Sequence, residues 1–119
     1  MRILIVDDDP LAGEMAVLIL ESAGHQCQRV ENGIEALELL QDAHALELVV
    51  SDMNMPLVSG ADLLAELRER GQRIPFILLT GDEPDVLAQQ VSGADGVLRK
   101  DASLEETLPL LVARQAASR

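Results

Sequence analysis

Five short apolar runs alternate with segments whose apolar residues recur at helical spacing, and this alternation constrains the fold more than any other feature of the chain. The runs, typical of short buried strands, cover residues 2–6, 26–30, 47–51, 74–80 and 96–99. Helices are predicted after each run, at 10–23, 33–40, 60–70, 84–92 and from 104 onward. Strands and helices that alternate through short loops form a parallel sheet covered on both faces. The sequence therefore predicts one α/β domain over residues 1–119, with five strands and five helices.

Several helix boundaries and faces can also be predicted. The first helix has apolar residues at spacing i, i+4, i+7 and i+8, and we expect them to form its buried face. They are Leu11, Met15, Leu18 and Ile19. Asp9 precedes Pro10 and is predicted to cap this helix. Ser103 and Glu106 have the spacing of a capping box before the last helix, and Pro109 should kink that helix or delay its start.

Composition narrows the classes of function. The formal net charge of -12 repels phosphate backbones and anionic lipid surfaces, so direct binding to nucleic acid or membranes is not expected. Phe76 is the only aromatic residue and Cys27 the only cysteine, which leaves no stacking platform for bases and no internal disulfide. With no leader and no apolar run of about 18 residues, the expected location is the cytoplasm.

Polar residues follow four of the five predicted strands. They are Asp7 and Asp8 after the first strand, Asp52 after the third, Thr80 after the fourth and Lys100 after the fifth. Sites in open parallel sheets form at the carboxyl ends of the strands, near the point where the strand order reverses. In a sheet with the order 2-1-3-4-5, the first and third strands are neighbours at that point. The sequence therefore predicts that the three aspartates converge.

Three carboxylates held close together resist ionising unless a cation neutralises them. Mg²⁺, or Mn²⁺ in its place, suits such an oxygen-rich set and leaves room for phosphate oxygens. Lys100 can place a positive charge on the same phosphoryl group, and Thr80 can donate a hydroxyl hydrogen bond to it. An Asp in these surroundings can act as a nucleophile that takes phosphate as an acyl phosphate. The plainer alternative is that Asp7 and Asp8 are solvated loop acids.

Four segments of the chain match the pattern of a known family. They read ILIVDDDP, VVSDMNMPLVSG, FILLTG and GADGVLRK, and the second contains Asp-x-x-Met-Pro-x-x-x-Gly at Asp52, Met55, Pro56 and Gly60. With these segments in this order, the chain resembles the receiver domain of two-component response regulators from about Arg2 to the last helix. The resemblance implies a flavodoxin-like (CheY-like) fold. It also implies a role in phosphorelay signalling rather than in metabolism.

The resemblance further implies how the acidic residues act. Asp52 would accept a phosphoryl group from a phosphohistidine of a sensor kinase or phosphotransfer protein. Asp8 would bind Mg²⁺ directly and Asp7 through water, and the backbone carbonyl of Asn54 would supply a further ligand. Receivers catalyse this transfer and usually their own dephosphorylation, and they pass the signal to a downstream protein or output domain.

The resemblance assigns the switch to Lys100, which would pair with the phosphoryl oxygens, and to Thr80, which would move toward them. The chain departs from the receiver pattern nearby. Val97 stands where an aromatic residue is common, and Asp101 stands where Pro usually follows the Lys. The stretch between Thr80 and Lys100 is about two residues shorter than usual. These changes gather on the face formed by the fourth helix, the fifth strand and the fifth helix, where many receivers meet partners.

Two other functions remain open at this point. One is a receiver-like interaction module that signals without phosphate, suggested by Val97 and Asp101. The other is a phosphohydrolase resembling the haloacid dehalogenase superfamily, in which Asp7 would be the nucleophile of an Asp-x-Asp pair with Asp9. Pro10 and the short chain, which leaves little room for a substrate cap, argue against the hydrolase.

Overall fold

The computed structural model describes residues 1–41, 45–81, 84, 91 and 93–117. The strand bounds agree with the prediction to within two residues, whereas the helix expected over 84–92 lies almost wholly outside the described residues. Among the described helices, none is both long enough and apolar enough to cross a membrane. The elements in chain order are β1 (Arg2–Val6), α1 (Pro10–Ser22), β2 (Gln26–Val30), α2 (Gly33–Leu39), β3 (Leu48–Asp52), α3 (Gly60–Glu69), β4 (Phe76–Thr80), β5 (Gly96–Arg99) and α5 (Leu104–Ala117).

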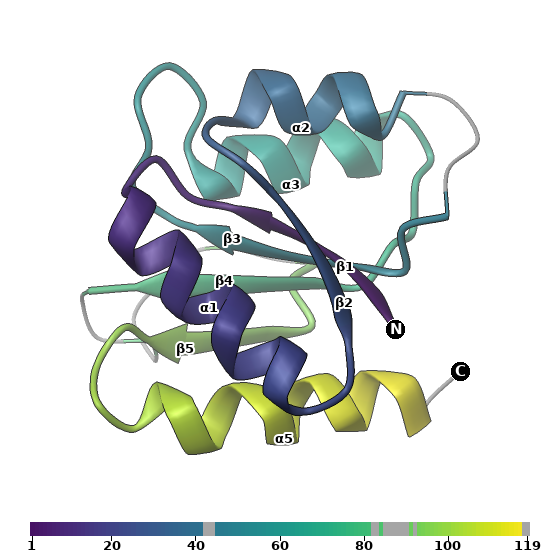
Figure 1. Ribbon diagram of the computed structural model, residues 1–119. Helices are drawn as coiled ribbons and strands as arrows, with labels where there is room; N and C mark the ends of the chain where they lie inside the picture. The colour runs from purple at the N-terminus through teal and green to yellow at the C-terminus, as the bar shows by residue number, and fades with distance from the viewer. Residues whose placement is uncertain (42–44, 82–83, 85–90, 92, 118–119) are drawn as a thin grey trace.

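The five strands form one parallel sheet in the order β2-β1-β3-β4-β5, which confirms the predicted topology. Figure 1 shows α2 and α3 on one face of the sheet and α1 and α5 on the other. β1 and β3 are neighbours, and their register pairs Val6 with Ser51. The residue that follows each member of this pair in the chain is an aspartate. Asp7 and Asp52 therefore lie side by side where the two strands end.

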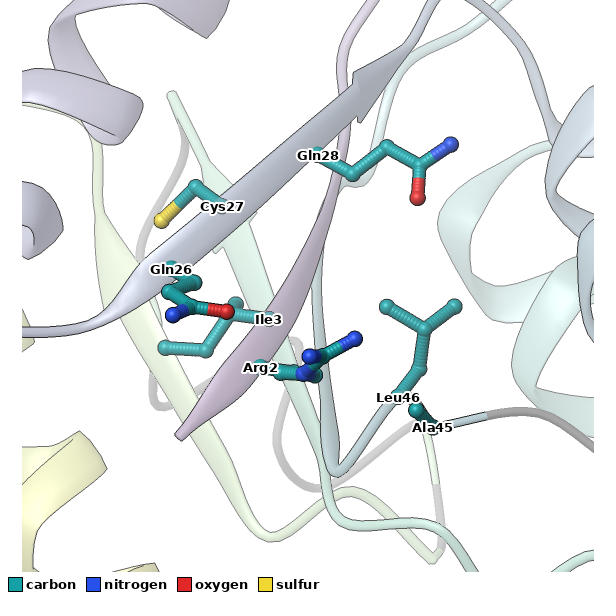
Figure 2. Close-up of a pocket in the computed structure, with 7 residues that line it drawn as sticks. All are labelled: Arg2, Ile3, Gln26, Cys27, Gln28, Ala45 and Leu46. Atoms are coloured by element: carbon teal, nitrogen blue, oxygen red, sulfur yellow. The ribbon is translucent and has the colours of Figure 1, made fainter.

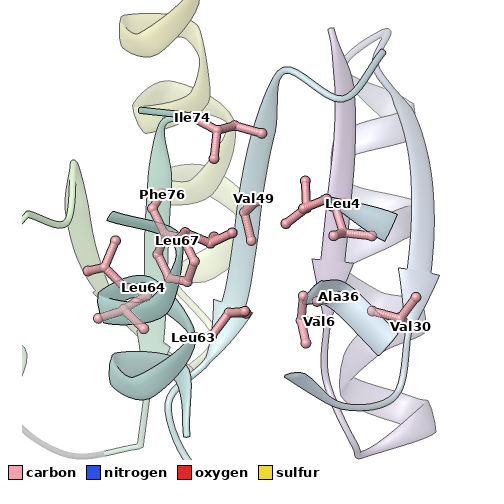
Figure 3. Close-up of a cluster of buried hydrophobic side chains, with 12 residues drawn as sticks. Leu4, Val6, Val30, Ala36, Val49, Leu63, Leu64, Leu67, Ile74 and Phe76 are labelled. Carbon is pink, nitrogen blue, oxygen red and sulfur yellow. The ribbon is translucent and has the colours of Figure 1, made fainter. Parts of the chain in front are cut away.

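Each face of the sheet has its own hydrophobic core. The core under α2 and α3 includes Leu4, Val49 and Phe76 from three neighbouring strands (Figure 3). The alternate residues, such as Ile5 and Val50, face the core under α1 and α5. β3 and β4 are buried along their whole length, which explains why their sequences read as continuous apolar runs. Each fully buried large side chain contributes about 1.5–3 kcal/mol relative to an exposed one.

The predicted buried face of α1 was wrong. Three of its four residues are exposed: Leu11 by 74%, Met15 by 55% and Leu18 by 61%. The buried residues of α1 are instead Gly13, Ala16 and Leu20. Small residues at two of these positions let the helix backbone approach β2 and the sheet closely. An apolar stripe of larger side chains is left on the solvent side.

Side-chain caps define the starts of three helices. Asp9 caps α1 as predicted, and its carboxylate accepts a hydrogen bond from the N–H of Leu11 at 3.0 Å. Asn32 caps α2 in the same way. Ser59 and Asp62 form a capping box at the start of α3, each accepting from the backbone N–H of the other. This box fixes the entry of α3 directly after the loop that follows β3.

α5 begins at Leu104 as predicted, but the predicted capping contact at its start was wrong. The hydroxyl of Ser103 donates to the carboxylate of Asp101 instead of capping the N–H of Glu106, which donates to the backbone carbonyl of Ser103 at 3.0 Å. Asp101 competes successfully because it also accepts from the N–H of Ser103 at 2.9 Å, closing a local turn. Pro109 does not delay the helix, which runs through it from Leu104.

Candidate functional site

Three carboxylates meet at the carboxyl ends of β1 and β3. Asp7 and Asp8 follow β1, and Asp52 is the last residue of β3. One carboxylate oxygen from each residue lies within 4.8 Å of the other two. Asp7 and Asp52 are buried, with 2% and 6% of their surface exposed, whereas Asp8 is exposed. The structure thus confirms the convergence expected from the strand order.

Lys100 reaches this cluster from the residue directly after β5. Its Nζ lies 3.1 Å from Oδ2 of Asp7 and 3.4 Å from Oδ2 of Asp52. The backbone N–H of Lys100 donates to the carbonyl of Thr80 at 2.8 Å, which continues the β4–β5 ladder by one residue. The side chain therefore leaves a fixed point of the sheet and bridges the two buried carboxylates.

The pKa values of Asp52 and Lys100 reflect these contacts. Burial raises the pKa of the Asp52 carboxyl and the charge of Asp7 adds to the effect, while Lys100 and the N–H of Asn54 only partly offset it. Burial alone would lower the pKa of Lys100, but its hydrogen bond to Asp7 and the charge of Asp52 outweigh burial and raise it. Lys100 therefore stays charged and supplies one positive charge against three carboxylates. The imbalance favours a divalent cation.

The turn from β1 into α1 separates the roles of the three successive aspartates. Asp7 accepts the N–H of Asp9 on its Oδ1 at 2.9 Å, while Asp9 turns its own carboxylate to the start of α1. The N–H of Asp7 donates to the carbonyl of Val30 at 3.1 Å, and its carbonyl accepts from Nη2 of Arg29 at 3.0 Å. Sequence reasoning missed Arg29, since nothing in the polar pattern of β2 distinguishes it from a solvent-exposed residue.

The end of β3 is held by contacts on several sides. The hydroxyl of Ser51 donates to the carbonyl of Asp52 at 2.9 Å. The N–H of Met53 donates to the carbonyl of Leu79 at 2.8 Å, and the N–H of Gly60 donates to the carbonyl of Met53 at 2.9 Å. The first residue of α3 is therefore anchored to the segment that carries the Asp52 carboxylate.

The loop between β3 and α3 contains a strained residue. Leu57 has a φ of 72°, a conformation that residues with a side chain rarely adopt. The N–H of Val58 donates to the carbonyl of Pro56 at 2.8 Å, which closes a tight three-residue turn around Leu57. The Leu57 side chain is 86% exposed. Little packing therefore offsets the strain.

Replacing Leu57 with Gly is expected to stabilise the domain. Relief of the positive φ should raise the free energy of unfolding by about 1–2 kcal/mol. The greater freedom of Gly in the unfolded chain should lower it again by about half of that amount. The net gain of roughly 0.5–1 kcal/mol should appear as a higher denaturation midpoint in urea. Leu110→Gly, at a similarly exposed position inside α5, serves as the control and should destabilise by about 1 kcal/mol. A Leu57→Gly variant less stable than the wild type would contradict the strain.

The remaining predicted site residues lie around the carboxylates. Thr80 ends β4 one residue past the partner of Asp52 in the register, and it is 1% exposed. The backbone N–H of Asn54 donates to the Asp52 carboxylate, and the Asn54 side chain is exposed. Val97 lies in β5 beside β4 and packs at the edge of the core under α2 and α3. Part of the shortened stretch between Thr80 and Lys100, namely 82–83, 85–90 and 92, lies outside the described residues.

A separate cavity of about 340 Å³ lies at the opposite end of the sheet (Figure 2). Its lining comes from the starts of β1 and β2 and the segment before β3: Arg2, Ile3, Gln26, Cys27, Gln28, Ala45 and Leu46. Burial raises the pKa of the Cys27 thiol to about 11, so the thiol stays protonated and weakly nucleophilic at neutral pH. The carboxylate cluster sits at the carboxyl ends of the strands, so this cavity adds nothing to it.

Residues 3–111 match the family of response regulator receiver domains. The chain belongs to this family. The receiver domain is 35% identical to the sensor histidine kinase RcsC of Escherichia coli (strain K12) over 124 aligned positions, which cover 100% of this chain and 13% of that protein. It is 34% identical to the response regulator MprA of Mycobacterium sp. (strain KMS), covering 91% of this chain and 47% of that protein. The receiver domain thus spans less than half the length of these curated relatives.

Solved structures show the same fold. The response regulator TrrA from Thermotoga maritima, in complex with Mg²⁺ and BeF, superposes with a TM-score of 0.86 at 30% identity and covers 96% of this chain and 97% of that one. The receiver domain of a signal transduction histidine kinase from Syntrophus aciditrophicus gives a TM-score of 0.84 at 36% identity, with 98% and 90% covered. The receiver domain is therefore a signalling domain of two-component systems and not a classical enzyme. The phosphohydrolase alternative also loses its second acid, because Asp9 caps α1.

The oxygen ligands of the carboxylate cluster, Asp7, Asp8 and Asp52, fit a hard divalent cation. Three carboxylates offer oxygen atoms at one point, and oxygen ligands are what Mg²⁺ and Mn²⁺ prefer. Two of the carboxylates are buried and fixed by hydrogen bonds, while exposed Asp8 leaves one side open to water and substrate. Mg²⁺ binds proteins in this manner, through a few carboxylates with several retained waters.

Proposed function

We propose that this receiver domain accepts a phosphoryl group on Asp52 from a phosphohistidine of a sensor histidine kinase or phosphotransfer protein. The position of Asp52 carries the proposal. Its carboxylate ends β3 at the point of reversed strand order, 3.4 Å from the ammonium of Lys100 and beside Asp7. A buried carboxylate with a raised pKa and a charge partner is a typical functional group.

In the proposed transfer, one carboxylate oxygen of Asp52 forms a bond to phosphorus as the bond from phosphorus to the donor imidazole nitrogen breaks. The electron pair of the broken bond stays on that nitrogen, and Asp52 becomes an acyl phosphate. Lys100 would transfer its hydrogen bonds from the free carboxylates to the phosphoryl oxygens. Asp7, Asp8, Asp52 and the carbonyl of Asn54 would hold Mg²⁺ or Mn²⁺, which neutralises negative charge on the reacting oxygens.

Thr80 would respond to phosphorylation; in support, it is buried at the end of β4, one residue past the register partner of Asp52. Its hydroxyl would reorient to donate to a phosphoryl oxygen. Val97 has a smaller side chain than the aromatic residue that receivers commonly carry at this position of β5. The side-chain movement on β5 that accompanies the reorientation of Thr80 would therefore be smaller. The change would pass to a downstream protein or output domain, with the whole of residues 1–119 acting as one domain in the cytoplasm.

A direct test uses a small acyl phosphate as the phosphodonor. Incubation with Mg²⁺ is expected to add the mass of one phosphoryl group to the intact protein, and chelation of Mg²⁺ is expected to prevent the addition. Stoichiometric addition to the folded protein supports the proposal. Steady release of phosphate from an unrelated phosphate ester, or no labelling with Mg²⁺ present, would count against it.

Mg²⁺ is expected to stabilise the folded domain. A cation that binds the native carboxylate cluster and not the unfolded chain adds about 2.7 kcal/mol at a concentration 100 times its dissociation constant. Thermal unfolding in Mg²⁺ should therefore occur at a higher temperature than in EDTA. NaCl at equal ionic strength controls for screening of the net charge of -12. Equal melting temperatures in Mg²⁺ and EDTA would contradict the cation site.

The apolar stripe on α1 would contact the phosphodonor. A groove of about 450 Å³ between α1 and the start of α5 is lined by both Met15 and Lys100, so the stripe is continuous with the reaction site. Glu105 lines the same groove, and exposed Glu14 flanks the stripe on α1. These features suit a donor helix with an apolar face and basic flanks.

Met15→Glu is expected to slow phosphotransfer from a cognate protein donor by at least about tenfold, since it places a charge in the apolar contact. Labelling by the small acyl phosphate should keep its wild-type rate, because that donor needs no docking surface. Ile34→Glu on α2 is the matched control, at a 44% exposed apolar position across the sheet. Equal losses with both donors would place the defect in the pocket rather than in docking.

A further inference from the structure

Arg29 reaches from the edge strand β2 under α1 to the turn that carries the acidic residues. In the register it lies beside Ile5, whose side chain faces the core under α1 and α5, so the Arg29 side chain points to that same face. Its Nη2 donates to the carbonyl of Asp7 at 3.0 Å. The adjoining Nε is buried and has no hydrogen-bond partner among the described residues. The guanidinium therefore donates to the Asp7 carbonyl while its Nε–H stays buried without a hydrogen bond.

Gly13 makes room for this side chain. A Cβ at Gly13 would lie 2.3 Å from Nε and 2.7 Å from Cδ of Arg29. Gly inside a helix is unfavourable relative to Ala, and Gly13 lies in the first half of α1 with ordinary helical backbone. The close approach of Arg29 supplies the physical reason for a glycine there. Arg29 and Gly13 therefore act as a pair.

The pair fixes the backbone of Asp7 from one side. The N–H of Asp7 donates to Val30 and the carbonyl accepts from Arg29, so two successive residues of β2 hold the same peptide segment. The Asp7 carboxylate is engaged by Asp9 and Lys100. Asp8, the exposed acid of the cluster, follows directly on this fixed segment. Its position relative to Asp52 thus depends on the backbone of Asp7.

We propose that Arg29 is a positioning residue of the carboxylate cluster, which holds the Asp7–Asp8 segment in the geometry that binds a divalent cation. The inference rests on the cation site of the proposed function. A cation that binds a preformed cluster loses less affinity to ordering of its ligands. Residues that orient metal ligands typically change metal affinity by about 10–100-fold when replaced.

The test measures Mg²⁺ affinity by calorimetric titration of the full chain with the metal alone. Arg29→Ala is expected to raise the apparent dissociation constant at least about tenfold. Its labelling rate by a small acyl phosphate should recover at saturating Mg²⁺, because the reacting groups are intact. Arg2→Ala is the matched control, since it removes the same charge at the opposite end of the sheet and should leave Mg²⁺ affinity unchanged.

Gly13→Ala separates positioning from charge and from general loss of stability. It keeps the guanidinium but displaces it, so it should weaken Mg²⁺ binding as Arg29→Ala does. Combined with Arg29→Ala it should cause no further weakening, and it should raise the melting temperature above that of Arg29→Ala alone because Ala favours the helix.

Equal Mg²⁺ affinity in Arg29→Ala, Arg2→Ala and the wild type would overturn the positioning role, as would independent losses from Gly13→Ala and Arg29→Ala. The proposed function fails by a different result. If the wild type binds Mg²⁺ but is never labelled, phosphoryl acceptance is wrong while the calorimetric comparison still reports on Arg29.

Discussion

Asp52→Asn is expected to abolish phosphoryl acceptance completely. An amide oxygen is a poor nucleophile and cannot form a stable acyl phosphate, so no other change at this position isolates the reacting atom as cleanly. The Asn side chain has nearly the same size and can still accept hydrogen bonds from Lys100 and from the backbone of Asn54. The fold of the pocket should therefore persist while its reaction is lost.

The same variant is expected to be more stable than the wild type in EDTA. The pKa of Asp52 is raised in the folded state by burial and by Asp7, so the folded protein holds this proton more tightly than the unfolded chain does. For an acid with a raised pKa, ionisation as the pH rises through the unfolded and then the folded pKa destabilises the folded state. At neutral pH the ionised Asp52 therefore lowers stability, and a neutral Asn removes that penalty.

Two measurements on one sample check both expectations: intact mass after incubation with a small acyl phosphate, and thermal unfolding in EDTA. Glu38→Gln, an exposed acid on α2, is the control and should be labelled as the wild type is. The stability gain should also shrink as the pH falls, since protonation then neutralises the wild-type carboxyl. Labelling that survives in Asp52→Asn would move the acceptor elsewhere, and a lower melting temperature in EDTA would contradict the raised pKa.

The positions of Asp7, Asp8, Asp52 and Lys100 were predictable from the sequence because parallel topology converts order along the chain into proximity in space. Apolar runs reveal the strands, and every strand of such a sheet ends at the same edge. The residue that follows each run therefore needs no further information to be placed. Asp9 was separable from its neighbours for a local reason, since Pro10 marks the start of a helix.

The face of α1 was not predictable because spacing does not report the distance between a helix and its sheet. Leu11, Met15 and Leu18 form a good apolar stripe, yet Gly13 and Ala16 allow a closer approach on another side. The apolar spacing correctly indicates a continuous apolar surface on α1, but the structure shows that this surface faces solvent rather than the sheet.

Hydrogen bonds between a side chain of one element and the backbone of another were also not predictable from the sequence. Arg29 lies in no sequence motif. Its partner is the backbone carbonyl of Asp7, and a backbone carbonyl is present in every residue type, so the sequence does not mark it. The positive φ of Leu57 is hidden because a leucine gives no turn signal, whereas Gly or Asn would. Ser103 was misassigned since Asp101 competes for its hydroxyl, and spacing rules consider one partner at a time.

Gly60→Ala is expected to cause the largest loss of stability among the substitutions considered. A Cβ at Gly60 would lie 2.5 Å from the carbonyl oxygen of Asp52, 2.6 Å from Cδ2 of Leu78 and 3.1 Å from Cα of Met53. Two of these contacts are to backbone that the sheet holds in place, so they cannot be relieved by turning a side chain. We expect a loss of about 3 kcal/mol, the upper end for overpacking, and a fall in melting temperature of roughly 10 °C.

The effect of Gly60→Ala should extend to the site, because α3 can only relieve the clash by moving away from β3 or by displacing the Asp52 peptide. Mg²⁺ should then raise the melting temperature of this variant less than that of the wild type. Gly81→Ala is the matched control, since no atom of the described residues lies within 4 Å of a Cβ there and its φ is not positive. Suppose that Gly60→Ala has the same melting temperature as Gly81→Ala and that Mg²⁺ raises it as much as it raises that of the wild type. Close packing of α3 on the end of β3 would then not be what holds Asp52 in place.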